Sequence, residues 1–428
     1  MTVLVTAHAW YGDMIGGTFR LASEFAEYLA WAGYDVSYLC CDVAPERRLP
    51  ARQVVNGVDV RRYLQPPDGR HFGRAARHVA RSWRLVRGLL RERPIAALSG
   101  HSPLQFLGAA LALRKTGAYC NYTVHSPFDD ELLCGVRSGR PALGTRARAA
   151  TARLVDRVNV YYANRVQTDS RFTLETMKRK HGQGVVDKGV AAPGWVDVQT
   201  FRHTWDRSTI RRRLGGAWAT DEPIFFTLRR LEPRMGLDLL VRAAARLRGG
   251  PRFHVLIGGS GPLHDELFQL AAQQGVQDRV RLLGRLPDAM VPLAYGAADC
   301  FVLPTRALEC FGLIVLEAFA AGKPVIAART AAIPELVARQ GEQWMFDPDD
   351  EAALADRLRA FLSGKLRVTI DTRSIAEEYD RSRVLPIWES LLFPDNGNGN
   401  AARAISRSRQ GSAPAPSSAR AWPSPREL

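Results

Sequence analysis

Two glutamates eight positions apart are the residues whose types and spacing most clearly suggest chemistry. Glu309 and Glu317 lie in the segment 304–325, which reads PTRALECFGLIVLEAFAAGKPV. Carboxylates accept hydrogen bonds from hydroxyl groups, so this pair could hold a polyhydroxylated ligand. The apolar run between them predicts a helix, and the N-terminus of a helix favours an anion such as phosphate. A phosphate site flanked by two carboxylates predicts a pocket for a nucleotide sugar.

A strand–helix–strand unit must position these carboxylates. The pattern predicts a strand at 300–303, a loop, a helix at about 312–321, a Gly-Lys-Pro turn and a second strand from Val325. Ligands of open α/β sheets bind at the carboxyl ends of the strands, which is where the loop and the start of this helix would lie. The backbone N–H groups expected to face the anion are those of Phe311, Gly312 and Leu313.

Length and composition fit two α/β domains. The chain has 428 residues, of which 46% are hydrophobic and 24% charged, as is usual for a globular enzyme. Its apolar runs are too short to span a membrane and its first residues lack the features of a signal peptide, so we expect a cytoplasmic protein. The six cysteines form no metal-ligand or disulfide pattern.

Other candidate residues follow predicted strands. Gly16 and Gly17 lie between the first strand and a helix, where small residues let a ligand approach the backbone. His125 follows a strand at 119–124, and His101 has a similar setting.

The 304–325 string resembles the Glu-x7-Glu motif of family 4 retaining glycosyltransferases, which have the GT-B fold. The Phe-Gly after the first glutamate, the Glu-Ala after the apolar run and the later Gly-x-Pro-Val all fit this motif. The resemblance implies transfer of a glycosyl group from a nucleotide-diphosphate sugar with retention of configuration. It implies that Glu309 holds the sugar hydroxyls, that Glu317 holds the ribose hydroxyls, and that His125 orients the sugar.

Further donor-binding residues are implied by the same resemblance. Arg230 matches the arginine of the family's Gly-Arg-Leu…Lys-Gly loop, but Met235 stands where the lysine is expected. We expect Arg234 to supply the missing charge to the donor diphosphate. The family's first-domain loop, which faces the donor phosphates, corresponds to Gly16 and Gly17. Arg285 and Leu286 lie in the segment that offers backbone groups to the nucleobase.

The resemblance also implies a domain organisation. We expect an α/β protein with an acceptor domain at 1–200 and a nucleotide-sugar domain at 201–372, both Rossmann-like and facing a central cleft. A C-terminal helix at 373–394, broken or kinked near Pro386, is expected to cross back to the first domain. The tail 395–428 has a composition typical of disorder. Neither a metal ion nor a cofactor is expected.

Charge suggests one more partner. The chain has a net charge of +16, and residues 1–200 hold 28 Lys and Arg against 17 Asp and Glu. One predicted helix carries a basic stripe, which is typical of a solvated helix face but also suggests contact with an anionic membrane surface. Nucleic-acid binding is disfavoured, because no aromatic platform accompanies the charge. The stripe comprises Arg74, Arg77, Arg81, Arg84, Arg87 and Arg91.

Two alternatives to a glycosyltransferase remain open at this stage. A GT-B-like nucleotide-sugar epimerase is disfavoured by the paired glutamates. A non-catalytic GT-B scaffold would be expected to lose the site residues, and only Met235 and a bulky Trp195 in an otherwise family-like turn suggest such a loss. The acceptor could be a glycan, a lipid-linked sugar or a small molecule.

Overall fold

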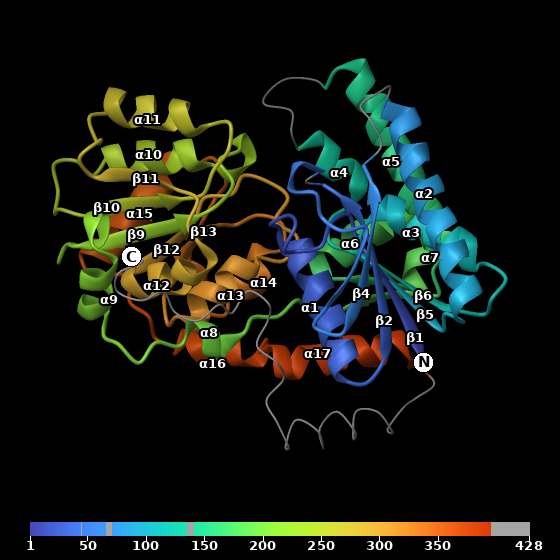
Figure 1. Cartoon of the computed structure of the whole chain (residues 1–428). Coiled ribbons are helices and arrows are strands. Elements are labelled where there is room, and N and C mark those ends of the chain that lie inside the picture. Colours follow the sequence, from blue (N-terminus) through green and yellow to red (C-terminus); the bar gives the residue numbers. More distant parts are fainter. Residues whose placement is uncertain (44, 66–70, 135–140, 395–428) are drawn as a thin grey trace. The chain divides into compact units, whose positions relative to one another are not determined.

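The computed structural model describes residues 1–43, 45–65, 71–134 and 141–394 (Figure 1). The predicted tail 395–428 therefore lies outside the described residues. The chain forms two compact units, each built around its own sheet. Of the described residues, the first unit contains 1–133, 141–194 and 382–394, and the second contains Trp195–Arg381.

The first unit is built on an eight-stranded sheet with the order β3-β4-β2-β1-β5-β6-β7-β8. Every neighbouring pair is parallel except β3 and β4. The central strand β1 is buried along its whole length, as expected for a strand covered on both faces. The strands are β1 (Thr2–Thr6), β2 (Asp35–Asp42), β3 (Arg52–Val55), β4 (Val58–Leu64), β5 (Ala97–Gly100), β6 (Tyr119–Val124), β7 (Arg165–Thr168) and β8 (Gly189–Ala191).

Helices cover both faces of this sheet. Helix α1 lies on one face, and α2, α3 and α5 lie side by side on the other (Figure 1). Gly108 lets α3 approach α2 closely, because a Cβ there would lie 2.4 Å from the Val79 carbonyl oxygen. The helices are α1 (Gly17–Trp31), α2 (His71–Glu92), α3 (Pro103–Leu113), α4 (Phe128–Leu133), α5 (Leu143–Tyr162), α6 (Arg171–His181) and α7 (Gln183–Val186).

The structure also contains a β3–β4 hairpin that the sequence analysis did not identify. Asn56 and Gly57 form the turn with φ of 47° and 81°. Positive φ at both central residues defines the type I′ turn that suits the twist of a hairpin. The Asn-Gly pair is the local signal that would have identified it.

The second unit has a six-stranded sheet in the order β11-β10-β9-β12-β13-β14, and every neighbouring pair is parallel. The predicted strand–helix–strand unit is confirmed as β12, α13 and β13. The strands are β9 (Ile224–Leu228), β10 (His254–Gly258), β11 (Val280–Gly284), β12 (Cys300–Leu303), β13 (Val325–Ala328) and β14 (Met345–Phe346).

Helices α10 and α11 cover one face of this sheet, and α12 and α13 cover the other (Figure 1). Both units are therefore α/β layers around a sheet that is parallel except for the β3–β4 pair, which confirms the predicted pair of Rossmann-like domains. The helices of the second unit are α8 (Val198–Phe201), α9 (Arg207–Leu214), α10 (Leu237–Ala245), α11 (His264–Gln273), α12 (Val291–Ala297), α13 (Leu313–Ala320), α14 (Ile333–Val337), α15 (Glu351–Leu362) and α16 (Thr372–Glu378).

The C-terminal helix packs on the first unit, as predicted. In α17 (Arg381–Leu392), Glu389 accepts hydrogen bonds from the Tyr28 and Tyr34 hydroxyls at 2.7 and 2.8 Å. Pro386 lies inside α17, so the helix is not broken there, while the predicted kink at this proline stays a prediction. The interruption falls at 379–380 instead.

A backbone bridge to Val196 explains that interruption. The Val196 N–H donates to the Tyr379 carbonyl, and the Val196 carbonyl accepts from the Arg381 N–H, both at 3.0 Å. Backbone groups used in this bridge cannot also continue a helix. The neighbouring Trp195 is 2% exposed and belongs to the packed interior, so its bulk does not support the scaffold alternative.

Candidate functional site at the carboxyl edge of the second sheet

The loops that follow β9, β10 and β12 meet at the carboxyl edge of the second sheet. Gly259 and Gly261, which follow β10, have φ of 122° and 158°. A Cβ at Gly259 would lie 1.8 Å from the Arg229 carbonyl oxygen, and one at Gly261 would lie 2.6 Å from that of Leu231. Only glycine allows the two loops to pack backbone against backbone.

Gly236 likewise allows close backbone packing, here between the loops that follow β9 and β12. Its φ is 66°, and a Cβ there would lie 1.9 Å from the Pro304 carbonyl oxygen. A side chain at this position would push apart the two loops that carry the candidate site.

We expect Gly236→Ala to destabilise the protein by at least about 2 kcal/mol, because it combines left-handed strain with a backbone clash. The free energy of unfolding in urea measures this effect. The matched control is Gly249→Ala, since a Cβ there meets nothing within 4 Å. The control should change stability by no more than about 0.5 kcal/mol, and equal losses in both variants would contradict the proposed role.

Arg306 ties these loops together electrostatically. Its Nη1 donates to Asp238 Oδ1 at 2.6 Å and to the Pro233 carbonyl at 2.9 Å, and its backbone N–H donates to the Arg234 carbonyl at 2.8 Å. Burial acts to raise the pKa of Asp238, but the hydrogen bonds and charge of Arg306 outweigh it and the pKa is lowered. Asp238 therefore stays ionised, and Arg306 serves the architecture of the loops.

Glu309 is paired with an arginine that the sequence analysis did not single out. The Arg229 Nη1 donates to Glu309 Oε2 at 2.8 Å, and these side chains are 7% and 17% exposed. The Glu309 backbone carbonyl accepts from the Ala332 N–H at 2.9 Å. Leu308, just before it, has a φ of 56°, a strained conformation for a branched residue. The carboxylate is thus held by a firmly shaped loop.

Met235 lies directly against Arg229. The Arg229 Nε and Nη2 atoms lie 3.3 and 2.8 Å from the Met235 sulfur, which is a weak hydrogen-bond acceptor. Arg234 donates from Nη1 to the Leu308 carbonyl at 3.1 Å, so it lies at the same edge. Arg230 instead has a side chain that is 63% exposed and pairs with Glu232 at 3.2 Å. Its predicted contact with the donor remains a prediction.

The start of α13 lies beside this cluster. The helix begins at Leu313, one residue later than predicted, and Gly312 precedes it with a φ of 99°. The first N–H groups of a helix have no intrahelical partner, so Phe311, Gly312 and Leu313 keep the anion-binding character expected of them. Glu317 lies one turn into the helix, is buried and accepts from the Tyr295 hydroxyl at 3.0 Å.

Arg285 and Leu286 follow β11, the edge strand of the sheet. Arg285 is exposed and Leu286 is half-buried. A Cβ at Gly258 would lie 3.2 Å from Leu286 Cδ1, which places Leu286 beside the end of β10.

The remaining predicted residues belong to the first unit. His125 follows β6 as predicted, but both of its ring nitrogens are engaged: Nδ1 lies 2.6 Å from Asp169 Oδ2, and Nε2 lies 3.0 Å from His101 Nδ1. Burial, with a further contribution from His125, lowers the pKa of His101 well below its usual value, so His101 is neutral. A hydrogen bond from the His125 ring to a sugar would require one of these contacts to break. Gly16 and Gly17 lie at the start of α1.

Comparison with known families covers most of both units. The sequence model described as Glycosyltransferase Family 4 matches residues 15–200, and the model described as Glycosyl transferases group 1 matches residues 209–383. The chain belongs to glycosyltransferase family 4. Met235, where the chain departs from the family pattern, lies directly against the Arg229 guanidinium.

Curated relatives match part of this family 4 chain. It is 35% identical over 153 residues to a GDP-mannose-dependent alpha-(1-6)-phosphatidylinositol monomannoside mannosyltransferase of Mycolicibacterium smegmatis, covering 34% of the chain and 39% of the relative. It is 31% identical over 245 residues to a D-inositol 3-phosphate glycosyltransferase of Mycobacteroides abscessus, covering 56% and 53%. The chain thus spans about half the length of the curated relatives it matches or less.

Solved structures confirm the predicted GT-B fold. Sucrose-phosphate synthase from Thermosynechococcus elongatus is 20% identical with a TM-score of 0.73, covering 96% of this chain and 98% of that one. Anabaena HepE, solved with UDP and glucose, is 18% identical with a TM-score of 0.69, covering 91% and 98%. At these identities the likeness concerns the fold.

Proposed function

We propose that the protein transfers a sugar from a nucleotide-diphosphate sugar to an acceptor hydroxyl with retention of configuration. The observation that carries this proposal is the buried Arg229–Glu309 pair beside the N-terminus of α13. A cation, a carboxylate and the first backbone N–H groups of α13 thus lie at one edge of the sheet. A sugar diphosphate offers one complementary group to each of them.

Each residue of this edge has a part in donor binding. The diphosphate lies against the first N–H groups of α13 and the guanidinium groups of Arg229 and Arg234, with the exposed Arg230 closing over it. Glu309 accepts from sugar hydroxyls, and Glu317 accepts from the ribose. Because the Met235 sulfur is a weak acceptor, a phosphate oxygen readily replaces it as a partner of Arg229.

The bond between the anomeric carbon and the diphosphate oxygen breaks in the reaction, and its electron pair leaves with the diphosphate. The acceptor hydroxyl attacks from the face that the diphosphate leaves, and its proton passes to a diphosphate oxygen, so configuration is retained. Arg229, Arg230 and Arg234 stabilise the charge that grows on the leaving group, which is electrostatic catalysis. No carboxylate nucleophile is needed in this scheme.

For the acceptor, we propose a molecule that carries a phosphorylated inositol or a related anionic headgroup. The printed names of the two curated relatives support this class, since one acts on a phosphatidylinositol monomannoside and the other on inositol 3-phosphate. The excess of basic residues in the first unit is consistent with an anionic acceptor.

We expect one nucleoside diphosphate among UDP, GDP and ADP to raise the thermal stability of the protein. A ligand at about 100 times its dissociation constant adds roughly 2.7 kcal/mol, which a melting curve resolves easily. Inorganic pyrophosphate at the same concentration is the control for simple anion binding. A rise in melting temperature with one nucleotide, but not with pyrophosphate, identifies the donor nucleotide.

The scaffold alternative has one observation in its favour, the missing lysine at Met235. It predicts that no nucleotide raises the melting temperature, whereas the glycosyltransferase proposal requires that one of them does. Absence of a shift with all three nucleotides and their sugar conjugates would therefore favour the scaffold.

A further inference from the structure

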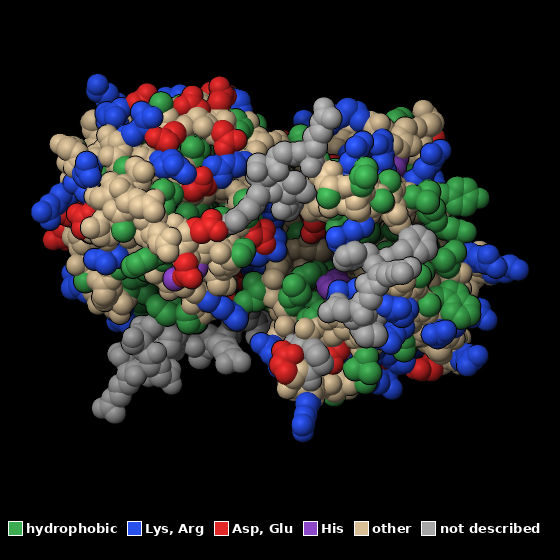
Figure 2. Space-filling model, turned by 90° about the horizontal axis from the view of Figure 1, so that it is seen from above, with side chains coloured by type: hydrophobic (Ala, Val, Ile, Leu, Met, Phe, Trp, Pro, Cys, Tyr) green, Lys and Arg blue, Asp and Glu red, His purple; other side chains and the backbone are tan. Residues whose placement is uncertain are grey.

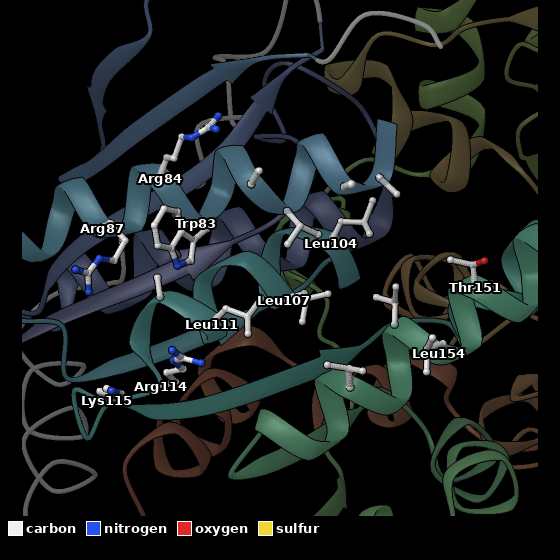
Figure 3. Close-up of a pocket in the computed structure, with 17 residues that line it drawn as sticks. Trp83, Arg84, Arg87, Leu104, Leu107, Leu111, Arg114, Lys115, Thr151 and Leu154 are labelled. Carbon is white, nitrogen blue, oxygen red and sulfur yellow. The ribbon is translucent and has the colours of Figure 1, made fainter. Parts of the chain in front are cut away.

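An apolar groove lies on the outer face of the first unit, between α2, α3 and α5 (Figure 3). Its volume is about 1040 Å³. Leu104, Leu107 and Leu111 of α3 lie along it, with Trp83 of α2 and Leu154 of α5 beside them (Figure 3). Trp83 is 42% exposed and Leu154 is 60% exposed, although both are large apolar side chains. Exposed apolar side chains grouped around a groove mark a binding surface.

Basic side chains lie together at one end of this groove (Figure 3). Arg84 and Arg87 come from α2, and Arg114 and Lys115 come from the end of α3 (Figure 3). Among the described residues, no carboxylate pairs with any of these four, and none of the residues that line the groove is acidic. The Arg87 guanidinium lies 6.0 Å from the centre of the Trp83 ring, so a cation is placed at the edge of the apolar surface.

Other arginines of this unit, near the groove, do form ion pairs with carboxylates. Arg61 pairs with Asp59 and Glu92, and Arg93 pairs with Asp35. Figure 2 shows hydrophobic and basic side chains gathered together at the side of the first unit where α2 and α5 lie. The groove is thus an apolar surface bordered by basic side chains that pair with no carboxylate among the described residues.

We propose that this groove is a docking surface for an anionic lipid bilayer. Lipid phosphates would contact Arg84, Arg87, Arg114 and Lys115, while Trp83 and the groove beneath take up acyl chain. The surface combines the two contributions that give an amphipathic helix stable membrane contact, buried apolar area and attraction to anionic lipid. No helix among residues 1–43, 45–65, 71–134 and 141–394 is long and apolar enough to cross a bilayer.

Charge argues against other occupants. A second copy docked through the same groove would bring the same four cations, and the two surfaces would repel. The chain's own tail, 395–428, contains five arginines against two acidic residues, so it is also repelled. An anionic surface is the complementary partner.

The first test measures binding to vesicles of phosphatidylcholine and phosphatidylglycerol in equal parts, and to vesicles of phosphatidylcholine alone. We expect binding to the first only. Replacing Arg84, Arg87, Arg114 and Lys115 together by glutamine should weaken it by about 100-fold or more, since each basic residue contributes about fivefold near an anionic surface. The matched control removes four exposed arginines of the second unit, namely Arg246, Arg248, Arg252 and Arg359.

A second measurement tests insertion of the apolar part. Lipid with brominated acyl chains quenches tryptophan fluorescence only where an indole enters the bilayer. We expect quenching in the wild type and its loss in Trp83→Phe, which keeps an aromatic ring and should still bind the vesicles. Unchanged quenching in Trp83→Phe would contradict the insertion of the Trp83 side chain into the bilayer.

The remaining outcomes are equally decisive. Equal loss of binding in the groove variant and the control would mean that net charge, and not this surface, attracts the protein. Failure of the wild type to bind, or capture by an acidic peptide in preference to vesicles, would overturn the proposal. Vesicle binding does not depend on glycosyl transfer, so this result stands apart from the proposed function.

Discussion

Glu309→Gln is expected to lower turnover by on the order of 100-fold or more, as when one transition-state hydrogen-bond partner is lost. The amide keeps the shape of the side chain but loses the negative charge that sugar hydroxyls and Arg229 both use. Because the Arg229 side chain is only 7% exposed, its charge is then poorly compensated. Steady-state kinetics with the identified donor measure the effect, and circular dichroism checks that the fold is retained.

Glu232→Gln is the matched control for this variant. Glu232 lies in the same group of loops and pairs with Arg230 and Arg234, but its side chain is 30% exposed. We expect its activity to fall by less than about tenfold, because exposed ion pairs contribute little. Near wild-type turnover of Glu309→Gln, or equal losses in the two variants, would remove the assigned role of Glu309.

The central element of this site could be predicted from sequence because its signals are local. Glu309 and Glu317 lie within one strand–helix–strand unit, and its apolar runs and Gly-Lys-Pro turn mark the elements directly. Helix α13 begins one residue later than expected because Gly312 has a positive φ, which sequence periodicity does not reveal. Such local patterns fix which elements form and in what order.

Contacts between distant residues could not be predicted in the same way. The interruption at 379–380 depends on a bridge to Val196, and the His125 ring is held by Asp169, 44 positions away. Pro386 appeared to be the natural break, yet tertiary contacts placed the break elsewhere. These outcomes depend on packing that propensity and periodicity do not encode.

Arg229 was missed for a related reason. Two consecutive arginines follow β9, and the family pattern pointed to the second of them. Neighbouring side chains at the end of a strand point to opposite sides, so only one of the two can point inward. The unusual feature of the sequence was the combination of an extra arginine at 229 with the loss of the lysine at Met235. Together they suggest that the cation has moved, and in the structure the Arg229 guanidinium lies against the Met235 sulfur.

The second large effect is expected when the positive charge of Arg229 is removed and then restored at position 235. Arg229→Met should lower kcat/KM by on the order of 100-fold, because one charged donor to the leaving diphosphate is lost. The double variant Arg229→Met with Met235→Lys moves the cation to the position of the family's lysine and should recover most of that loss. Recovery is expected because the two positions share one space: Arg229 Nη2 lies 2.8 Å from the Met235 sulfur.

The single variant Met235→Lys completes a double-mutant cycle of positions 229 and 235. It places a second cation against Arg229, so like charges repel and we expect lower stability without higher activity. The two substitutions should therefore be strongly non-additive, which is the signature of residues in direct contact. Arg281→Met, at an exposed arginine of β11, controls for loss of charge alone and should leave kcat/KM unchanged.

The nucleotide-induced thermal shift separates donor binding from folding in all four variants. If Arg229 holds the diphosphate, the shift falls in Arg229→Met and returns in the double variant, in parallel with kcat/KM. A double variant no more active than Arg229→Met would show that the arginine only holds Glu309 in place. Full activity in Arg229→Met would show that Arg230 and Arg234 neutralise the diphosphate without it, and that the loss of the lysine has no substitute in this chain.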